Sequence, residues 1–266
     1  MWTAWEFNPT VVSGMLALGL LYFLFAGPWR GRFPASVPVT PSQAGYFYSG
    51  LIVFWIVLQS PIDRVGDDFL FLLHMFQHMV IILIVPILLL KGTPGWMLEP
   101  LMRLPILSLA IRTLCRPLVA FTVFNLVFAV AHLPVFFDPV NSNEALHAIE
   151  HLVFLVTALA MWMPVLSPLP SLPTLSYPMQ MGYMFLQTLP CSIVGAFIAL
   201  SGDTLYQRYA LAPRISVLTS LQDQQLGGLL MWVGTGMFFF GVMMVMFFLW
   251  FQQEEGKGRL PVQAAG

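Results

Sequence analysis

The sequence predicts an all-α membrane protein, a seven-transmembrane-helix bundle with its N-terminus outside the cell and its C-terminus in the cytoplasm. Hydrophobic residues make up 58% of the 266-residue chain and charged residues only 9%, with a mean hydropathy of +0.82. A soluble domain carries about 25% charged residues, so this composition indicates a protein that lives in a bilayer. The net charge of −1 gives no basic surface that would attract nucleic acid.

Each span is expected where an apolar run approaches the roughly 20 residues that a helix needs to cross the hydrocarbon core. The seven segments, in order, lie near residues 10–26, 44–59, 68–90, 113–131, 144–166, 179–200 and 226–251. The connections between them, such as GPWRGRFPASVPVTPS and SPLPSLPTLSYP, contain proline and glycine that interrupt a helix. Together the spans are expected to form a single integral-membrane helical domain over residues 1–266.

Individual residues set the edges of these segments. The first segment follows a stretch without Lys or Arg, so we expect a retained span rather than a secretory signal. The second is the shortest. The third enters at Asp67–Asp68 and ends before Lys91, and the fifth begins near Glu144. The seventh starts in LQDQQLGGLLMWVGTG, where Gly227 and Gly228 allow neighbouring helices to approach closely.

Lysine and arginine predict the orientation, because short cytoplasmic loops carry an excess of these residues. With seven spans, the first, third and fifth connections and the C-terminal tail share one side of the membrane. Eight basic residues fall on that side: Arg30, Arg32, Lys91, Arg103, Arg112, Arg116, Lys257 and Arg259. Only three fall on the other side: Arg64, Arg208 and Arg214. This distribution places the C-terminus in the cytoplasm.

The third connection is expected to lie along the cytoplasmic face of the membrane. It mixes Trp96, Met97 and Leu101 with Glu99 and Arg103, a composition typical of an amphipathic interfacial segment. A surface that docks a partner protein is the alternative interpretation.

The chain's histidines are the strongest functional signal. All five fall in or beside the third, fourth and fifth spans, as His74, His78, His132, His147 and His151. Two pairs have i,i+4 spacing, which places both imidazoles of a pair on one side of a helix. Ionisable side chains inside a membrane are costly and usually functional. In the predicted topology all five lie toward the outer side, and consecutive spans are usually neighbours.

Imidazole is the commonest metal ligand, so we interpret the five histidines as a membrane-embedded metal site, with copper as the expected ion. Imidazole also suits zinc, iron and nickel, and Met75 and Met79 are further candidates for copper. For His132 an interhelical hydrogen bond is the alternative role, and for His147 a solvated helix start.

Two acidic residues are candidates for supporting roles. Residues 147–151 spell H-x-x-E-H, a pattern of one class of zinc metallopeptidases, but a third ligand, an open water position and a substrate cleft are missing. Glu150 is therefore expected to orient an imidazole. Asp223, at the start of the seventh span, either caps its helix or supports the site directly.

Four sequence blocks resemble those of a known family. They are HMFQHM followed by PILLLKGTP, then ALHAIEHLVFLVTALAMW, ALSGDTLYQRY and DQQLGGLLMW. In this order and on these spans they are similar to the seven-transmembrane CtaG family of bacterial cytochrome c oxidase assembly factors. By matching motif, the resemblance implies that His74, His78, His147 and His151 handle the metal, with Glu150 and Asp223 in support. His132 fits the family's pattern less distinctively.

The resemblance also implies a function. We expect a non-enzymatic factor in a bacterial plasma membrane that binds copper, as Cu(I), and passes it to apo subunits of a haem–copper oxidase, whose own copper sites lie toward the outer half of the membrane. Membrane lipid and a second copy of the chain are further expected partners. A zinc-dependent hydrolase, a haem-binding b-type cytochrome and a copper permease are the alternatives. The apolar inner halves of the spans argue against the permease.

Overall fold

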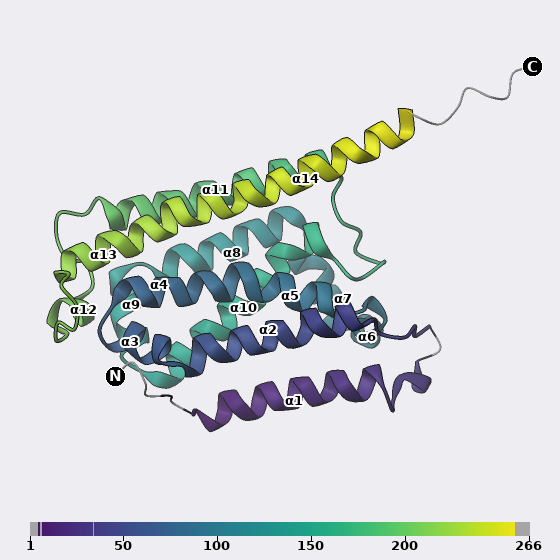
Figure 1. Ribbon diagram of the computed structural model, residues 1–266, viewed down its shortest axis with the longest axis horizontal. Helices are drawn as coiled ribbons and strands as arrows, with labels where there is room; N and C mark the ends of the chain where they lie inside the picture. Colours follow the sequence, from purple (N-terminus) through teal and green to yellow (C-terminus); the bar gives the residue numbers. More distant parts are fainter. Residues whose placement is uncertain (1–4, 6, 34, 259–266) are drawn as a thin grey trace, which may run out of the picture.

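The computed structural model describes residues 5, 7–33 and 35–258, and every regular element in those ranges is helical (Figure 1). Arg259 and the side chain of Lys257, both used to predict the orientation, lie outside this description. The helices that extend along the bundle run nearly parallel to one another (Figure 1). They are α1 (Pro9–Ala26), α2 (Pro41–Gln59), α4 (Phe71–Met79), α5 (Val85–Gly92), α8 (Pro117–Ala131), α10 (Glu144–Leu166), α11 (Tyr177–Ala199), α13 (Ser220–Leu229) and α14 (Thr235–Gly258).

Within the described residues, five continuous helical segments are long and apolar enough to cross a membrane: Pro9–Ala26, Phe71–Gly92, Glu144–Leu166, Tyr177–Ala199 and Ser220–Gly256. Two bent pairs pass the same test together. Helices α2 and α3 (Pro61–Asp68) meet at 44°, and α7 (Pro105–Leu114) and α8 meet at 78°. The number of candidate spans rises from five to the predicted seven when each bent pair is counted as one span. The prediction of an all-α, multi-pass membrane protein is confirmed, and the orientation of the termini stays a prediction.

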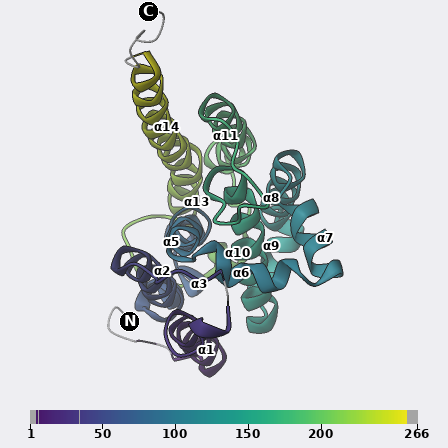
Figure 2. The same cartoon turned by 90° about the vertical axis from the view of Figure 1, so that its right-hand side faces the viewer.

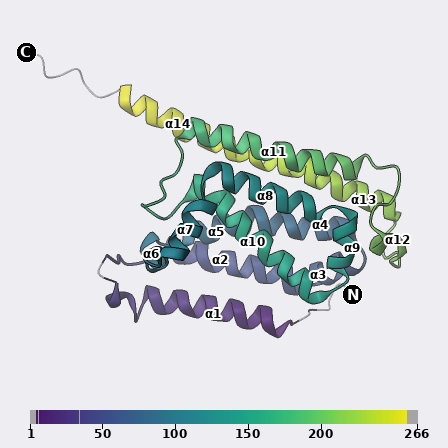
Figure 3. The same cartoon turned by 180° about the vertical axis from the view of Figure 1, so that it is seen from behind.

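Shorter helices lie at the two ends of the bundle and distinguish one end from the other. At one end lie α3, α9 (Pro134–Asn141) and α12 (Gln207–Leu211), and at the other lie α6 (Gly95–Met102) and α7 (Figures 1 and 3). We call these the α12 end and the α6 end. A 3-10 turn (Arg30–Arg32) joins α1 to α2 at the α6 end. The connections at the α6 end carry the basic residues that are predicted to be cytoplasmic, so these residues lie on the α6 side of the bundle.

The rod formed by α4 and α5 lies at the centre of the bundle. Helices α2, α10 and α13 pack around it, while α1 lies at one edge against α2 and α14 at the opposite edge against α11 (Figures 1 and 2). A π-helical stretch, Val80–Ile84, joins α4 to α5, and another, Leu230–Gly234, joins α13 to α14. Such wide turns often occur within helices near functional sites. The first begins two residues after His78.

Pro86 explains one bond that stabilises the central rod. Proline has no backbone N–H, so the carbonyl four residues earlier, that of Ile82, loses its usual helical donor. The indole Nε1–H of Trp162, on α10, donates to that carbonyl at 3.0 Å. Trp162 is fully buried, so this bond pairs two polar groups that water cannot reach.

Proline also explains why several helices begin where they do. Pro61 and Pro117 are first residues of α3 and α8, and the residue before each is extended, with ψ of 170° at Ser60 and 133° at Arg116. A residue before proline is disfavoured in the α conformation, so each proline forces a break. Helix α8, the second part of the bent fourth span, therefore starts at Pro117, whereas the sequence predicts a straight span from residue 113, and Asp68 closes α3 instead of opening α4.

The third connection is only partly the interfacial segment that the sequence predicts. In α6, Trp96 and Met97 are buried, and the Trp96 ring packs 5.7 Å from that of Phe33. These residues point into the bundle because α6 packs closely on it at Gly95, where a Cβ would collide with the backbone of Pro168. In α7, by contrast, Ile106 is 87% exposed and Leu109 is 68% exposed, as expected of a segment facing lipid.

Gly195 provides a test of close packing between α11 and α13. A Cβ there would lie 2.6 Å from the backbone nitrogen of Trp232 and 2.9 Å from the carbonyl oxygen of Gly228. We predict that Gly195→Ala lowers the unfolding free energy by about 1–3 kcal/mol through overpacking, although alanine is the better helix former. Gly182→Ala, on the same helix with open space at its Cβ, serves as the control. Thermal unfolding in one detergent compares them, and equal melting temperatures would contradict the close contact.

Candidate metal centre

All five histidines are buried side by side toward the α12 end of the bundle. His74 and His78 lie on α4, His132 directly follows α8, and His147 and His151 lie on α10. Their relative exposure ranges from 0% for His74 to 8% for His147. Three elements that are neighbours in the chain therefore bring five imidazoles to one buried region.

The rings lie close enough to act as one group. Along each helix, the i,i+4 pairs have ring centroids 4.3 Å apart for His74 and His78 and 4.2 Å apart for His147 and His151. Between α4 and α10, His74 lies 5.2 Å from His147 and His78 lies 5.1 Å from His151. His132 is at the edge of the group, 6.3 Å from His78.

Asp67 fixes the orientation of His74. The Nδ1 of His74 lies 2.9 Å from Oδ1 of Asp67, and the imidazole N–H donates to the carboxylate. In a neutral ring this leaves the lone pair on Nε2, and that atom is buried with no hydrogen-bond partner among the described residues. A carboxylate that holds one ring nitrogen while the other faces a metal is a recurrent arrangement in metal sites.

His132 is fixed in the same way by its own helix. Its Nδ1–H donates to the carbonyl oxygen of Phe128 at 2.7 Å, and its Nε2 is buried without a partner in the described part of the chain. The observed bond lies within one helix, so it is different from the interhelical bond considered as an alternative. The hydroxyl of Tyr206 donates to the carbonyl oxygen of His132 at 2.9 Å and holds the end of α8 in place.

His78 and His151 face each other directly. Their Nε2 atoms lie 3.1 Å apart. Two nitrogens bound to one tetrahedral ion at about 2.0–2.1 Å would lie roughly 3.3–3.4 Å apart, so the pair is nearly at a ligand-to-ligand spacing. The same distance suits a single N–H···N hydrogen bond between two neutral rings. The Nδ1 of His78 has no partner among residues that the structure describes.

His147 lies between two carboxylates without a hydrogen bond to either. Its Nε2 is 3.5 Å from Oδ2 of Asp67, and its Nδ1 is 3.7 Å from Oε2 of Glu150. Both ring nitrogens and this oxygen of Glu150 are buried and unpartnered within the described ranges. Glu150 therefore lies beside the cluster at more than hydrogen-bonding distance from His147, and its role in orienting an imidazole stays a prediction.

The segment ALSGDTLYQRY holds Asp67 beside the histidines. Arg208 donates from Nε to the carbonyl oxygen of Asp67 at 2.8 Å, and its guanidinium pairs with Asp68 at 3.0 Å. The hydroxyl of Tyr209 donates to the carbonyl oxygen of Gly66 at 2.9 Å. Burial raises the pKa of Tyr209 well above its usual value, so the hydroxyl stays protonated and keeps donating.

Asp223 caps the helix that bears His74 and His78. Its two carboxylate oxygens accept the backbone N–H groups of Phe71 at 2.8 Å and Leu72 at 3.1 Å, at the start of α4. The sequence suggests a cap for its own helix, but Thr219 fills that position for α13. Asp223 therefore supports the cluster from another helix, by satisfying the free N–H groups at the N-terminus of α4, and contacts no imidazole directly.

The donor set fits a metal ion that prefers nitrogen ligands. Five imidazole nitrogens are buried and unpartnered among the described residues: Nε2 of His74, Nδ1 of His78, Nε2 of His132, and both nitrogens of His147. Ligand atoms of His74, His78 and His147 all lie within 4.8 Å of one another. Because one ion would hold them roughly 3.3 Å apart, small side-chain movements would complete such a site.

Asp67 is the site residue that sequence reasoning missed. It lies seven residues, or two helical turns, before His74, a spacing that places both on one face of an unbroken helix. The break at Leu70, whose φ of −130° and ψ of 106° are extended, hides this relation, because the two residues belong to different helices. Only the packing of α3 on α4, which allows Asp67 to reach back to His74, reveals it.

The fold and this cluster define a multi-pass helical membrane protein with a buried histidine site. The family model for the cytochrome c oxidase caa3 assembly factor (Caa3_CtaG) matches residues 20–253. The chain therefore belongs to the cytochrome c oxidase caa3 assembly factor family, as its sequence blocks predict. No curated protein matches the chain. No solved structure matches it.

The cross-helix cap can be tested with Asp223→Ala. This change leaves two N–H groups at the start of α4 without their acceptor, at a cost of about 1–3 kcal/mol for each that stays buried. We predict a lower melting temperature in detergent for Asp223→Ala. Asp203→Ala is the control, because the Asp203 side chain is exposed and only its backbone atoms form the observed hydrogen bonds. A melting temperature equal to that of Asp203→Ala would show that the cap contributes nothing.

Proposed function

We propose that this assembly factor binds copper, as Cu(I), at the five-histidine cluster and passes it to an apo subunit of a haem–copper oxidase. The single observation that supports this best is the group of five buried imidazole nitrogens without partners, described above. Buried polar groups normally have partners, and a metal ion supplies one for several imidazoles at once. Copper is the cargo of the protein in this proposal, and no catalytic residue is required.

The proposed roles follow from the positions of the side chains. His74, His78 and His147 form the first ligand set, since their ligand atoms lie within 4.8 Å of one another. His151 extends the set through its contact with His78, and His132 borders it. Asp67 orients His74, while Glu150 and Asp223 support the site as described above.

The arrangement suits a cargo that must be released. His78 lies beside His151 and also near His74 and His147. An ion bound there can therefore exchange its ligands one at a time instead of losing all of them together. A few neutral nitrogen donors suit Cu(I), while zinc and iron also accept imidazole, so metal analysis decides the identity. The thioether of Met79 is engaged already, because the hydroxyl of Thr235 donates to its sulfur at 3.2 Å.

Two alternative functions receive less support. Two axial histidines on opposite faces of a haem iron place their nitrogens about 4 Å apart in a line, at roughly 2 Å per bond. The Nε2 atoms of His78 and His151 are only 3.1 Å apart, and the rings of the two i,i+4 pairs pack with centroids 4.2–5.2 Å apart. For a zinc hydrolase, Glu150 would act as the base, but it is packed beside His147 with its Oε2 buried.

The proposed location is the plasma membrane of a bacterium, with the cluster in its outer half. Most basic residues of the connections lie on the α6 side, and the histidines lie toward the α12 end. Because short cytoplasmic loops carry an excess of Lys and Arg, this distribution supports a metal-binding end outside the cytoplasm. The oxidase subunit would then approach from the α12 end or through the outer leaflet, and a second copy of the chain is a further proposed partner.

The role of the histidines can be tested by metal analysis of purified protein. We predict that His78→Ala and His151→Ala each lose most of the bound copper, and that terminal oxidase activity in cells falls with it. Thr157→Ala is the control on α10, because the Thr157 hydroxyl bonds only to its own helix backbone. Unchanged copper in a histidine variant removes that residue from the site, and zinc in place of copper would contradict the proposed cargo.

Asp67 and its neighbour Asp68 offer a matched pair. Asp67→Asn removes the charge that orients His74, so we predict a loss of copper affinity of about 10–100-fold, which is typical for such outer partners. Asp68→Asn should leave the affinity unchanged, because Asp68 pairs with Arg208 at 3.0 Å instead. Titration with a competing Cu(I) chelator measures both variants. Equal affinities would show that the Asp67–His74 contact plays no part in metal binding.

A further inference from the structure

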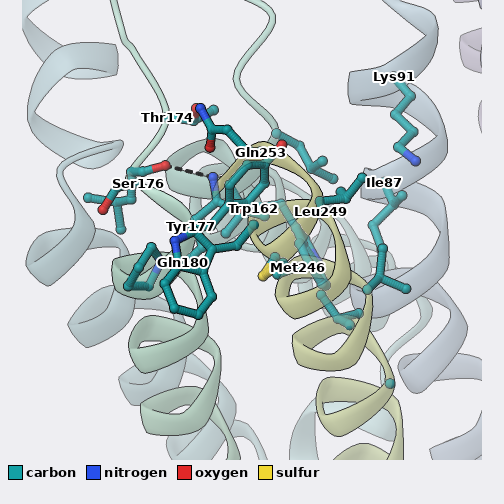
Figure 4. Close-up of a pocket in the computed structure, with 18 of the residues that line it drawn as sticks. Ile87, Lys91, Trp162, Thr174, Ser176, Tyr177, Gln180, Met246, Leu249 and Gln253 are labelled. Atoms are coloured by element: carbon teal, nitrogen blue, oxygen red, sulfur yellow. Dashed lines mark hydrogen bonds between the residues drawn. The ribbon is translucent and has the colours of Figure 1, made fainter. Parts of the chain in front are cut away.

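A cavity of about 1080 Å³ lies far from the histidines, between α14 and the central rod. Its walls come from α5, α10, α11, α14 and the segment before α11, and it reaches the last turn of α5, where Lys91 lies (Figure 4). Tyr177 and Gln180 lie on one side of it and Ile87 and Lys91 on the other (Figure 4). The cavity forms because α14 packs along α11 at the edge of the bundle, so that the opposite side of α14 does not pack against α5 (Figure 2).

The deep part of this cavity is apolar and opens sideways. Trp162 forms its buried wall, and Met246 and Leu249 line it from α14. At its margin, Met237 is 70% exposed and Val245 is 60% exposed. Because α14 belongs to a segment apolar enough to span a membrane, this opening faces the hydrocarbon of the bilayer.

The end of the cavity near α6 is polar. Lys91, the last-turn cation of α5, lines it together with Ser176, Gln180, Gln253 and the acidic Glu254. The ammonium of Lys91 lies 5.7 Å from the ring centroid of Tyr46. One end thus presents a cation, a carboxylate and hydrogen-bonding groups, and the rest is lined mainly by apolar side chains.

The dimensions favour a lipid over a partner helix. From Met237 to Leu249 the apolar wall on α14 extends roughly 18 Å, at 1.5 Å per residue. One leaflet contributes about half of a hydrocarbon core that is about 30 Å thick. The cavity therefore matches one leaflet, whereas a spanning helix needs the whole thickness and a volume of roughly 2,400 Å³, taken as a cylinder about 10 Å wide.

We infer that this cavity is a binding site for one glycerophospholipid, with its acyl chains along Trp162 and Met246 and its phosphate at Lys91. The acyl chains replace contacts that α14 does not make with α5, and Lys91 meets the phosphate at the membrane surface. The site is separate from the histidine cluster and does not depend on the proposed copper cargo.

Gly241, which lines the cavity, allows a test that fills it. A Cβ at Gly241 meets nothing within 4 Å, so Gly241→Phe places a ring in the cavity without a backbone collision. Gly236→Phe is the matched control: it lies on the same helix, has the same open space, and faces a different groove. Phospholipid retained by the detergent-purified protein is measured by native mass spectrometry and phosphorus analysis.

We expect a tenfold weaker affinity for phospholipid in Gly241→Phe, and therefore about tenfold less retained phospholipid. We expect no loss in Gly236→Phe. Val245→Trp, at the exposed margin, is a second filling variant if Gly241→Phe folds poorly by circular dichroism. Equal retention in the filling variants and the control overturns the site. So does a cavity that retains only detergent, or that captures a partner's membrane helix.

Lys91→Met tests the headgroup end. It keeps an apolar side chain and removes the charge, so we expect about tenfold weaker binding of added phospholipid to delipidated protein, typical of a lost charge-assisted contact. Binding of diacylglycerol, which has no phosphate, should not change. Equal loss of both lipids, or no loss of either, overturns the assignment of the phosphate to Lys91.

Discussion

The burial of five imidazoles in one apolar region is the constraint on which the rest of the structure depends. Each ring brings two nitrogens that need partners, and five of these ten nitrogens are buried without one among the described residues. A buried polar group left without a partner costs about 1–3 kcal/mol, and a whole protein is stable by only about 5–15 kcal/mol. The cluster is therefore expensive for the fold, and a bound ion that satisfies several nitrogens would offset that cost.

The surrounding contacts show how the fold tolerates this cost. Long-range hydrogen bonds from side chains to the backbone fix the elements that bear or flank the histidines: Asp223 holds the start of α4, Tyr206 the end of α8, and Tyr209 the helix α3. These bonds leave the imidazoles themselves few alternatives to their observed positions. A preorganised cluster loses less conformational entropy when it binds an ion than a flexible one would.

Features that depend on spacing and composition can be predicted from the sequence. Contacts between a side chain and another element of the chain cannot. The spans follow from apolar length, and the meeting of the rings follows from two i,i+4 pairs on consecutive helices. The contacts of Asp67 and Asp223 could not be predicted, because each side chain binds an element other than its own: Asp67 across a helix break, and Asp223 from 151 or 152 residues away. The pairing of Asn125 with Gln187, at 2.7 Å inside the bundle, is another long-range contact among spans expected to be apolar there.

The central rod connects the histidine cluster to the lipid-sized cavity through contacts that exist in the structure. His78 lies two residues before the π-helical stretch, and the carbonyl of Ile82 in that stretch accepts the indole N–H of Trp162, which lines the cavity. A chain of contacts of this kind does not by itself couple the two sites. Coupling requires an element with two arrangements, whose equilibrium is shifted by binding at either site. The π turn is the element in this rod best suited to such a role, because Pro86 has already removed one helical hydrogen bond from it and Trp162 supplies the replacement from outside the rod.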